Sequence, residues 1–238
     1  MLNRRTILLT LGAFALAALC VRLGFWQWHR MEHKKQQQAL IERHLNAAPV
    51  PVQSVLQPGH PVAEHAEWTR VRATGTFDTR RQVTVKFTTR EGKAGADVVT
   101  PLVLADGSAL LVNRGWMPTD NTNARPTNIP TPPQGQVTVE GWIRPDNQAG
   151  RNAVVPADGQ VRAVASDGLK AHVGRELLPG FVNLQKPTTA GLAPEPRPHV
   201  GHALNYFYAL QWWFFAGLAL IGPFWFSREP QAKAIRSA

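Results

Sequence analysis

A short segment, HRMEH at residues 29–33, contains residue types that can bind a metal ion. His29, Glu32 and His33 match the pattern H-x-x-E-H, in which two histidines one helical turn apart bind zinc beside a glutamate that acts as general base. The match spans only five residues, and patterns of that length recur by chance. It also lies where an apolar helix would leave a membrane. We therefore interpret the segment as a polar turn at a membrane interface and assign no catalytic residue and no metal ligand to it.

Other catalytic chemistries find little support in the sequence. None of the five serines lies in a nucleophile elbow, and Ser108 is typical of a hairpin turn. The glycine clusters do not form a phosphate-binding loop, and the acidic residues are scattered singly. The single cysteine, Cys20, lies in an apolar segment, so the rest of the chain has neither an internal disulfide nor a cysteine-pair metal site.

The C-terminal part of the chain contains a long uncharged segment. From Phe207 to Phe226 there are 20 residues without a charge, which as a helix would extend about 30 Å, the thickness of the hydrocarbon layer of a bilayer. The segment is predicted to span a membrane, and a buried hairpin helix is the alternative. Adjacent Trp212 and Trp213 would face two directions, one ring towards lipid and the other towards the first span, a flat ligand or another helix, unless both only anchor the helix. Aromatic residues gather at both ends like interfacial belts, namely Tyr206, Tyr208, Trp212, Trp213, Phe224, Trp225 and Phe226.

The N-terminal part shows the same features in reverse order. Two arginines precede an apolar run from Ile7 to Val21, which Arg22 interrupts before the run continues to Trp28. A cleaved signal peptide, including one of the twin-arginine type, is the alternative. We favour an uncleaved membrane span, because the apolar character continues past the alanine cluster to an aromatic belt. If the span ends near Trp28, Arg22 lies within snorkelling reach of that surface.

Both tails are basic, and the positive-inside rule therefore predicts that both lie in the cytoplasm. The part between the spans holds 20 of the 26 Lys and Arg and 15 of the 16 acidic residues, a net charge of +5. Because no basic helix and no cluster of aromatics with arginine occurs in it, nucleic-acid binding is not expected. No transit peptide precedes the first span, so a bacterial plasma (inner) membrane is expected. The predicted parts are cytoplasmic tails at 1–5 and 227–238, transmembrane helices at 6–28 and 206–226, and an extracytoplasmic domain at 29–205.

The extracytoplasmic part is expected to be mainly β. The segment RMEHKKQQQALIERHL continues the first span as an exposed helix, and a proline-rich link follows. Alternating runs such as TRVRATGTF, RQVTVKFTT and QVTVEGWIR predict strands, and LADGSALLVNRGW predicts a hairpin that turns at Asp106 and Gly107. One short helix is predicted in SDGLKAHVGREL and one more strand in GFVNLQ. The fold class is therefore a membrane-anchored α+β protein, with two transmembrane helices flanking a small β-barrel or curled sheet.

The segment LVNRGWMP is the most compact motif of this domain. Leu110 to Val112 alternate as in a half-buried strand, and Gly115 ends it, where positive φ or a close backbone approach would exclude a side chain. In a straight strand Arg114 and Trp116 lie on one face, at the rim of the domain. This predicts either a structural cation–π pair or a platform for a partner or for an anionic group of a ligand.

Three segments in this order resemble the Surfeit locus protein 1 family of cytochrome c oxidase assembly factors. They are LGFWQWHRMEHK, LVNRGWMP and NYFYALQWWFFA, and the resemblance covers nearly the whole chain. In the family's third signature, H-x-x-Y-A-x-x-W, Asn205 stands where the family has histidine. The matching residues are Leu23, Gly24, Trp26, Gln27, Arg30 and Lys34 of the first signature, Val112, Asn113, Arg114, Gly115 and Trp116 of the second, and Tyr208, Ala209 and Trp212 of the third.

The resemblance implies a non-enzymatic role in respiratory-chain biogenesis. Members act like chaperones that help to insert haem a into oxidase subunit I or to stabilise it there, which implies subunit I, haem a synthase and membrane lipid as partners. With Asn205 in place of histidine, His202 with Tyr208 and Trp212 becomes the candidate site for a transiently bound haem a, and His199 lies one helical turn further out. From composition alone, a doubly anchored envelope hydrolase or ligand-binding module is the alternative function.

Overall fold

The computed structural model describes residues 4–120 and 125–226. Its chain divides into two compact units, one containing both long helices up to Leu40 and from Pro198, the other containing Ile41–Arg197. The predicted tail at 227–238 and the side chains of the predicted second aromatic belt, Phe224 to Phe226, lie outside the described part. The predicted limits of the membrane spans and of the extracytoplasmic domain stay predictions.

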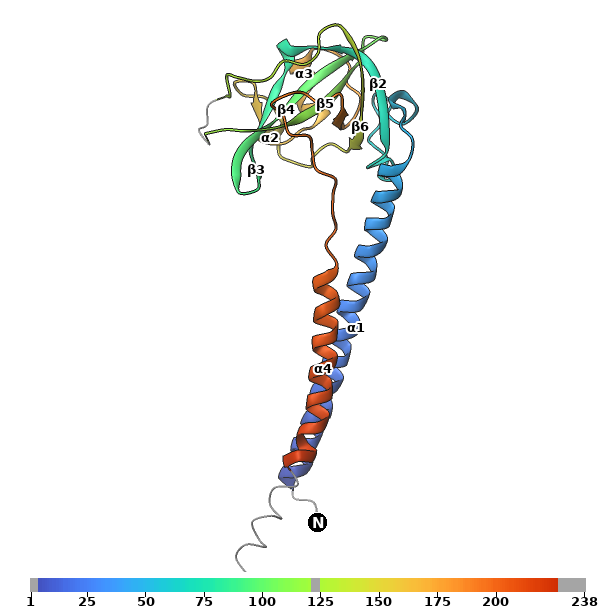
Figure 1. Cartoon of the computed structure of the whole chain (residues 1–238), viewed down its shortest axis with the longest axis vertical. Coiled ribbons are helices and arrows are strands. Elements are labelled where there is room, and N and C mark those ends of the chain that lie inside the picture. The colour runs from blue at the N-terminus through green and yellow to red at the C-terminus, as the bar shows by residue number, and fades with distance from the viewer. Residues whose placement is uncertain (1–3, 121–124, 227–238) are drawn as a thin grey trace, which may run out of the picture. The chain divides into compact units, whose positions relative to one another are not determined.

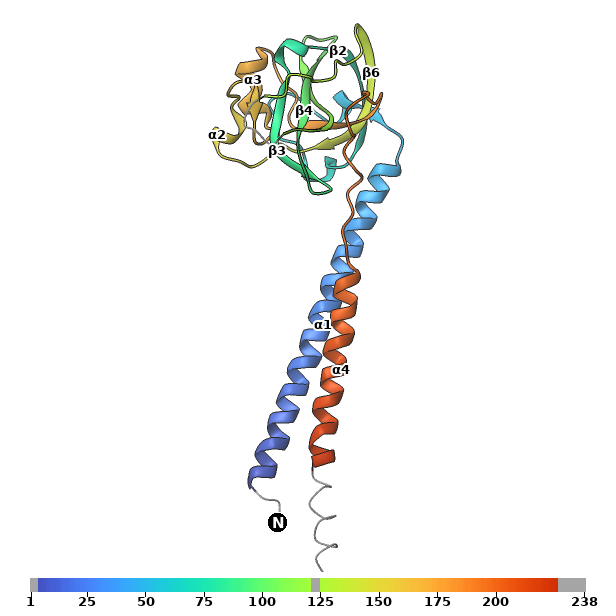
Figure 2. The same cartoon turned by 60° about the vertical axis from the view of Figure 1, so that its left-hand side comes forward.

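The two long helices are α1, Arg4–Asn46, and α4, Ala203–Phe226. Each contains a stretch that is long and apolar enough to cross a membrane, so the two predicted apolar helices are confirmed as helices. As predicted, α1 continues without interruption past the apolar segment, through the polar residues up to Asn46. Figures 1 and 2 both show α1 and α4 side by side and running in opposite directions.

The surface on which α1 and α4 meet follows a heptad pattern. The least exposed residues of each helix recur at intervals that alternate between three and four, which is the spacing of a coiled-coil seam. Half of the twelve seam residues are alanine, glycine or cysteine, and such small residues are typical of the contact surfaces of membrane helix pairs. In α1 the seam includes Ala17, Cys20, Gly24, Gln27, Met31 and Lys34; in α4 it includes Asn205, Ala209, Trp212, Ala216 and Ala219, and His202, directly before α4, continues the same spacing.

The second unit is built on a closed β-barrel. Its five barrel strands pair in the order β2-β6-β8-β5-β4, and an additional pairing of β4 with β2 closes the ring. All neighbours in the ring are antiparallel except β5 and β8, which are parallel. The ring strands are β2 Arg70–Phe77, β4 Lys93–Leu104, β5 Ala109–Pro118, β6 Gln136–Arg144 and β8 Phe181–Lys186.

Shorter elements surround this barrel. Strand β3, Val83–Arg90, pairs with β4 outside the ring, and β1 and β7 extend the two edges of the sheet. The remaining elements are β1 Val50–Pro51, β7 Gln160–Val161, the helices α2 Arg151–Val154 and α3 Ser166–Val173, and the 3₁₀ turns η1 Val52–Ser54, η2 Glu64–Ala66 and η3 Thr79–Arg81.

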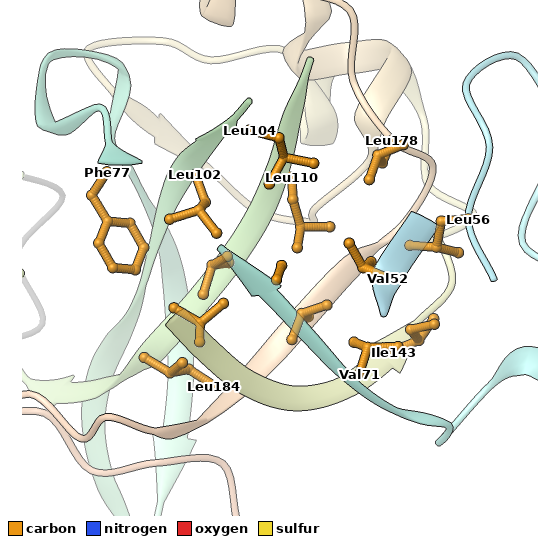
Figure 3. Packing of buried hydrophobic residues seen from close by; sticks show 14 residues of the cluster. Val52, Leu56, Val71, Phe77, Leu102, Leu104, Leu110, Ile143, Leu178 and Leu184 are labelled. Atoms are coloured by element: carbon orange, nitrogen blue, oxygen red, sulfur yellow. The ribbon is translucent and has the colours of Figure 1, made fainter. Parts of the chain in front are cut away.

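Two hydrophobic clusters lie on opposite faces of the curled sheet. The first takes residues from all five ring strands and therefore fills the barrel; Figure 3 shows it, with Val71, Leu102, Leu110, Ile143 and Leu184 among its members. The second lies outside the ring against β3, β4 and β5, where α3 covers it. Burial of these side chains is the main stabilising contribution to the domain.

The hairpin, the helix and the last strand predicted from sequence are confirmed. The turn between β4 and β5 lies at Asp106 and Gly107, whose φ is 82°, and Asp106 accepts hydrogen bonds from the backbone and hydroxyl of Ser108. The prediction of a half-buried strand for β5 was wrong. Leu110 and Val112 lie in the first hydrophobic cluster and Ala109 and Leu111 in the second, and all residues from Ala109 to Trp116 are buried.

Candidate functional site

A polar cluster lies in the middle of the apolar seam between α1 and α4. Asn205 is only 8% exposed, and its amide nitrogen donates to Oε1 of Gln27 over 2.7 Å. Its amide oxygen accepts from Nζ of Lys34 over 2.9 Å. Gln27 and Lys34 lie two helical turns apart on one face of α1, so a single asparagine contacts both. The first and third signature segments therefore meet at this cluster.

Aromatic rings pack beside the polar cluster, around Trp213. The indole of Trp213 lies 5.6 Å from the ring of Phe25 and 5.9 Å from that of Trp28, centroid to centroid. Gly24 makes this packing possible, because a Cβ at that position would lie 2.2 Å from Nε1 of Trp213. Of the alternatives left open for the two adjacent tryptophans, packing on the first helix is the one found for Trp213. Tyr206 extends the group, with its ring 6.3 Å from that of Trp28.

Two other residues of the first signature lie on the outer face of α1. Trp26 is 53% exposed, and the guanidinium of Arg30, one helical turn on, stacks over its ring at 5.5 Å. In α4, Tyr208 is 49% exposed, whereas Trp212 is half-buried and meets Phe215 edge to face at 6.0 Å. Within the first and third signatures, some residues therefore build the helix pair, and others stay exposed and available to a partner.

Three side chains of this region, those of Asn205, His202 and His199, are the candidates for an axial ligand of a haem iron. The two hydrogen bonds of Asn205 use both its amide nitrogen and its amide oxygen, so this side chain is not available as an iron ligand. His202 directly precedes α4; its Nδ1 is buried and has no hydrogen-bond partner among the described residues. His199 is exposed. An imidazole with an unpaired ring nitrogen fits an axial haem ligand, and His202 is therefore the residue of this region that fits best.

The histidine and glutamate residues of the HRMEH segment do not form a metal site. His29, Glu32 and His33 are all exposed on α1. Among the residues that the structure describes, no group of three or more His, Cys, Asp and Glu side chains could hold a metal ion.

The second signature forms a bulge in β5. Val98 of β4 pairs with Gly115 and its neighbour Val99 pairs with Asn113, which leaves Arg114 as the extra residue. Asn113 stabilises the bulge: its Oδ1 accepts from the backbone N–H of Gly115 and its Nδ2 donates to Asn183 on β8. Gly115 has a φ of 133°, a conformation that a side chain would strain.

The bulge directs Arg114 into the domain instead of to its rim. The side chain is 1% exposed; Nε donates to Oγ1 of Thr100, and Nη2 donates to Oε1 of Gln82 and to the backbone oxygen of Pro130. All three acceptors are neutral, and Nη1 has no partner in the described part. Burial without a carboxylate lowers the pKa of Arg114 to about 10.

The prediction that Arg114 and Trp116 pair at the rim was therefore wrong. The reason is the bulge, which ends the simple alternation of side chains on which that prediction depended. The guanidinium of Arg90 lies over the ring of Trp116 instead, 5.8 Å from the ring centroid. Its backbone pairs with Ala193 in the segment that leads towards α4.

Arg90 connects this same segment to the barrel. It donates to Asp97 on β4 over 2.9 Å, pairs with Glu195, and donates to the backbone oxygens of Ala193 and Pro194. Burial raises the pKa of Asp97 to about 6. The positive charge of Arg90 lowers this pKa and the negative charge of Glu195 raises it, but burial is the largest effect. This ionic contact was not predicted, because Glu195 is far from Arg90 and Asp97 in the sequence and the three residues carry no motif.

A half-open cavity of about 540 Å³ lies beside α3 in the barrel unit. Its walls include His60, Asp146, Ser166 and Lys170. The hydroxyl of Ser166 donates to Oδ2 of Asp146 over 2.6 Å, and its backbone N–H donates to Oδ1 of the same residue, which fixes the start of α3. Within the described ranges no hydrogen bond joins a serine to a histidine.

Comparison with known proteins assigns the chain to a family. The model of the SURF1 family matches residues 14–217. Over 232 residues the chain is 29% identical to an uncharacterized SURF1-like protein of Mycobacterium tuberculosis, covering 92% of this chain and 84% of the relative. It is 34% identical over 152 residues to a SURF1-like protein of Monosiga brevicollis, which covers 55% of this chain and 56% of the relative. Human Surfeit locus protein 1 is 30% identical over 156 residues, 55% of this chain and 50% of the human protein. The chain, with its two apolar helices and β-barrel, belongs to the SURF1 family.

Proposed function

We propose that this protein is a membrane-anchored assembly factor for a haem–copper oxidase, and that it assists the insertion of haem a into subunit I or stabilises the haem there. The SURF1 family is known as a family of cytochrome oxidase assembly factors that are generally non-catalytic. The observation that carries the proposal is the joining of two family signatures in one helix pair, through Asn205, Gln27 and Lys34.

The chemistry of the helix pair supports a role in binding more than a role in catalysis. An amide network between two apolar helices fixes their register, because a polar residue in such a seam disfavours other alignments. It supplies no general base and no nucleophile. A fixed helix pair in a membrane, with Trp26, Arg30 and Tyr208 exposed, is suited to holding a partner subunit or a flat cofactor in one orientation.

For haem a we propose His202 as the axial ligand, with Tyr208 and Trp212 against the porphyrin. Bound haem would supply an iron that accepts a neutral imidazole nitrogen. Support comes from the buried, unpaired Nδ1 of His202. Protein purified from cells that make haem a should show a Soret band, and His202→Ala should lose most of it while still entering the membrane. If the variant retained all of the haem, the ligand would have to be another residue or a partner.

We propose that the protein is a multi-pass protein of a bacterial plasma membrane, with both tails in the cytoplasm and the barrel outside. The two helices support membrane anchoring by length and composition. A cytoplasmic reporter fused after Ser227 should be active, and an exported reporter should be active in the segment TNIPTPPQG, residues 127–135. A mature N-terminus near Ala18 would contradict this topology, because the first span would then be a cleaved signal.

Deletion of the gene tests the assembly function. Reduced membranes of the deletion strain should show a weaker haem a band and less assembled oxidase, and a plasmid copy should restore both. Unchanged haem a and oxidase would favour the alternative, a doubly anchored ligand-binding module, for which the cavity of about 540 Å³ beside α3 would be the candidate site.

A further inference from the structure

Arg22 is a charged residue in the apolar part of α1 that the helix pair does not cover. Its seam neighbours Cys20 and Gly24 are buried, whereas Arg22 is exposed on the other side of the helix. Phe25 and Trp26, each 53% exposed, lie on the same outer side. Arg22 therefore faces away from α4 with Trp26 beside it, whereas Phe25 lies at the margin of this face, where its ring also contacts Trp213 of α4.

The chain offers Arg22 no counterion within either apolar helix. No acidic residue precedes Glu32 in the sequence, and α4 contains none. In the described part of the chain, Arg22 has no hydrogen bond and no ion pair. An unpaired charge in the hydrocarbon layer is costly, so charged residues in membrane helices almost always pair or face a polar cavity.

The direction of the side chain limits which anion can reach it. Trp28, at the end of the apolar segment, lies six residues beyond Arg22, or about 9 Å along the helix. Side chains on a helix tilt towards its N-terminus, and for Arg22 that direction leads away from the Trp28 end. Lipid phosphates at that end are within snorkelling reach of Arg22 only if its side chain turns against this tilt. Arg30, stacked on Trp26, lies closer to them.

We infer that the face of α1 formed by Arg22, Phe25 and Trp26 binds a transmembrane helix of a partner protein that carries a carboxylate at the depth of Arg22. A second copy of this chain cannot supply that carboxylate at this depth, because α1 contains no acidic residue before Glu32 and α4 contains none. A guanidinium forms two parallel hydrogen bonds with a carboxylate, and the flanking rings of Phe25 and Trp26 provide apolar contact around the pair. The inference rests on the proposed membrane placement of α1.

The test is association with designed peptides in phosphatidylcholine vesicles. The full chain, labelled with a fluorescent donor, is mixed with acceptor-labelled Leu/Ala transmembrane peptides that carry one Glu or one Gln about 9 Å below the outer interface. Energy transfer should show that wild type binds the Glu peptide roughly fivefold or more tightly than the Gln peptide. Arg22→Leu should bind both peptides equally, and Arg22→Glu should prefer a peptide with Lys at the same depth.

Matched controls distinguish recognition of a carboxylate from lipid binding and from self-association. Arg43→Leu, at an exposed arginine of α1 beyond the apolar segment, should keep the wild-type preference for the Glu peptide. Equal binding of the two peptides to wild type would overturn the inference. Loss of bound phosphatidylglycerol in Arg22→Leu would also overturn it, because a lipid would then be the partner of Arg22. Loss of energy transfer between two labelled copies of the chain in this variant would overturn it as well, because the partner would then be a second copy.

The peptide assay does not measure oxidase assembly. If deletion of the gene lowered haem a but the peptides bound equally, the assembly function would stand and this docking face would not. If the Glu preference were found but deletion left the oxidase intact, the face would still bind an acidic membrane helix, and the assembly function would be wrong.

Discussion

The amide nitrogen of Asn205 donates a hydrogen bond to Oε1 of Gln27 over 2.7 Å, between helices whose contacting residues lie 178 positions apart in the sequence. Lys34 donates to the oxygen of the same amide. A single side chain therefore links two signature segments, and the asparagine that stands in place of histidine is a structural residue of the helix pair in this chain.

Replacement of Asn205 by leucine should weaken the pairing of α1 with α4. Gln27 and Lys34 would each lose a partner in an apolar seam, at a cost of about 1–2 kcal/mol. The variant should show lower abundance in membranes and a lower melting temperature in detergent. Asn205→His, which keeps a donor and an acceptor, should retain most of the stability. Leu204→Ala, at a residue that is 72% exposed, is the matched control. Equal melting of Asn205→Leu and Leu204→Ala would mean that the network does not stabilise the pair.

Even a methyl group at position 24 should separate the two helices. The Cβ of Gly24→Ala would lie 2.2 Å from Nε1 of Trp213, so the indole or the helix must move. Gly12→Ala, on the same helix with nothing within 4 Å of its Cβ, is the control and should be neutral or stabilising. Melting temperatures of the two variants provide the comparison. Trp213→Ala should remove the difference between them, and a difference that persisted in that background would point to another cause.

Arg114→Ala should destabilise the barrel instead of affecting only a binding surface. The substitution leaves a cavity and takes the donor away from Gln82, Thr100 and the oxygen of Pro130, at a cost on the order of 2–4 kcal/mol. Thermal unfolding should show the loss. Arg72→Ala, at an exposed arginine of β2, should change little. Normal stability of Arg114→Ala together with reduced oxidase would restore a direct functional role for this residue.

The stability of the barrel should fall as pH rises, because of the carboxyl group of Asp97. Burial raises its pKa in the folded protein from 3.8 to about 6, so the folded state binds the proton more tightly than the unfolded state. The stabilising contribution is complete below about pH 4 and is lost as pH rises through 6. It amounts to about 2–3 kcal/mol. Asp97→Asn should remove this part of the pH dependence in denaturant unfolding between pH 4 and 7, and the exposed Asp167→Asn should not. Parallel pH profiles for wild type and Asp97→Asn would contradict the assignment.

Local patterns in the sequence predicted many of the elements. The hairpin at Asp106 and Gly107, the helix at Ser166–Val173 and the strand at Phe181–Lys186 follow from turn residues and alternation within a few positions. The two long helices follow from the length of their apolar segments. Closure of the barrel could not be predicted from local patterns, because the pairing of β2 with β4 depends on which strand edges meet in three dimensions.

The site residues were less predictable for the same reason. A bulge shifts every side chain after it, and nothing in LVNRGWMP alone shows that Arg114 is the extra residue opposite Val98 and Val99. The partners of Asn205 are likewise distant in the sequence. A polar residue at a seam position of an apolar helix was a signal that could have indicated a buried network.

The haem a content of subunit I tests the central proposal most directly. Tagged subunit I is isolated from a deletion strain and from strains that carry wild type, Asn205→Leu or Gly12→Ala, and haem a is measured per subunit. The assembly function predicts a low ratio in the deletion strain, a partly restored ratio with Asn205→Leu, and full ratios with wild type and Gly12→Ala. Fully loaded subunit I in the deletion strain would contradict it.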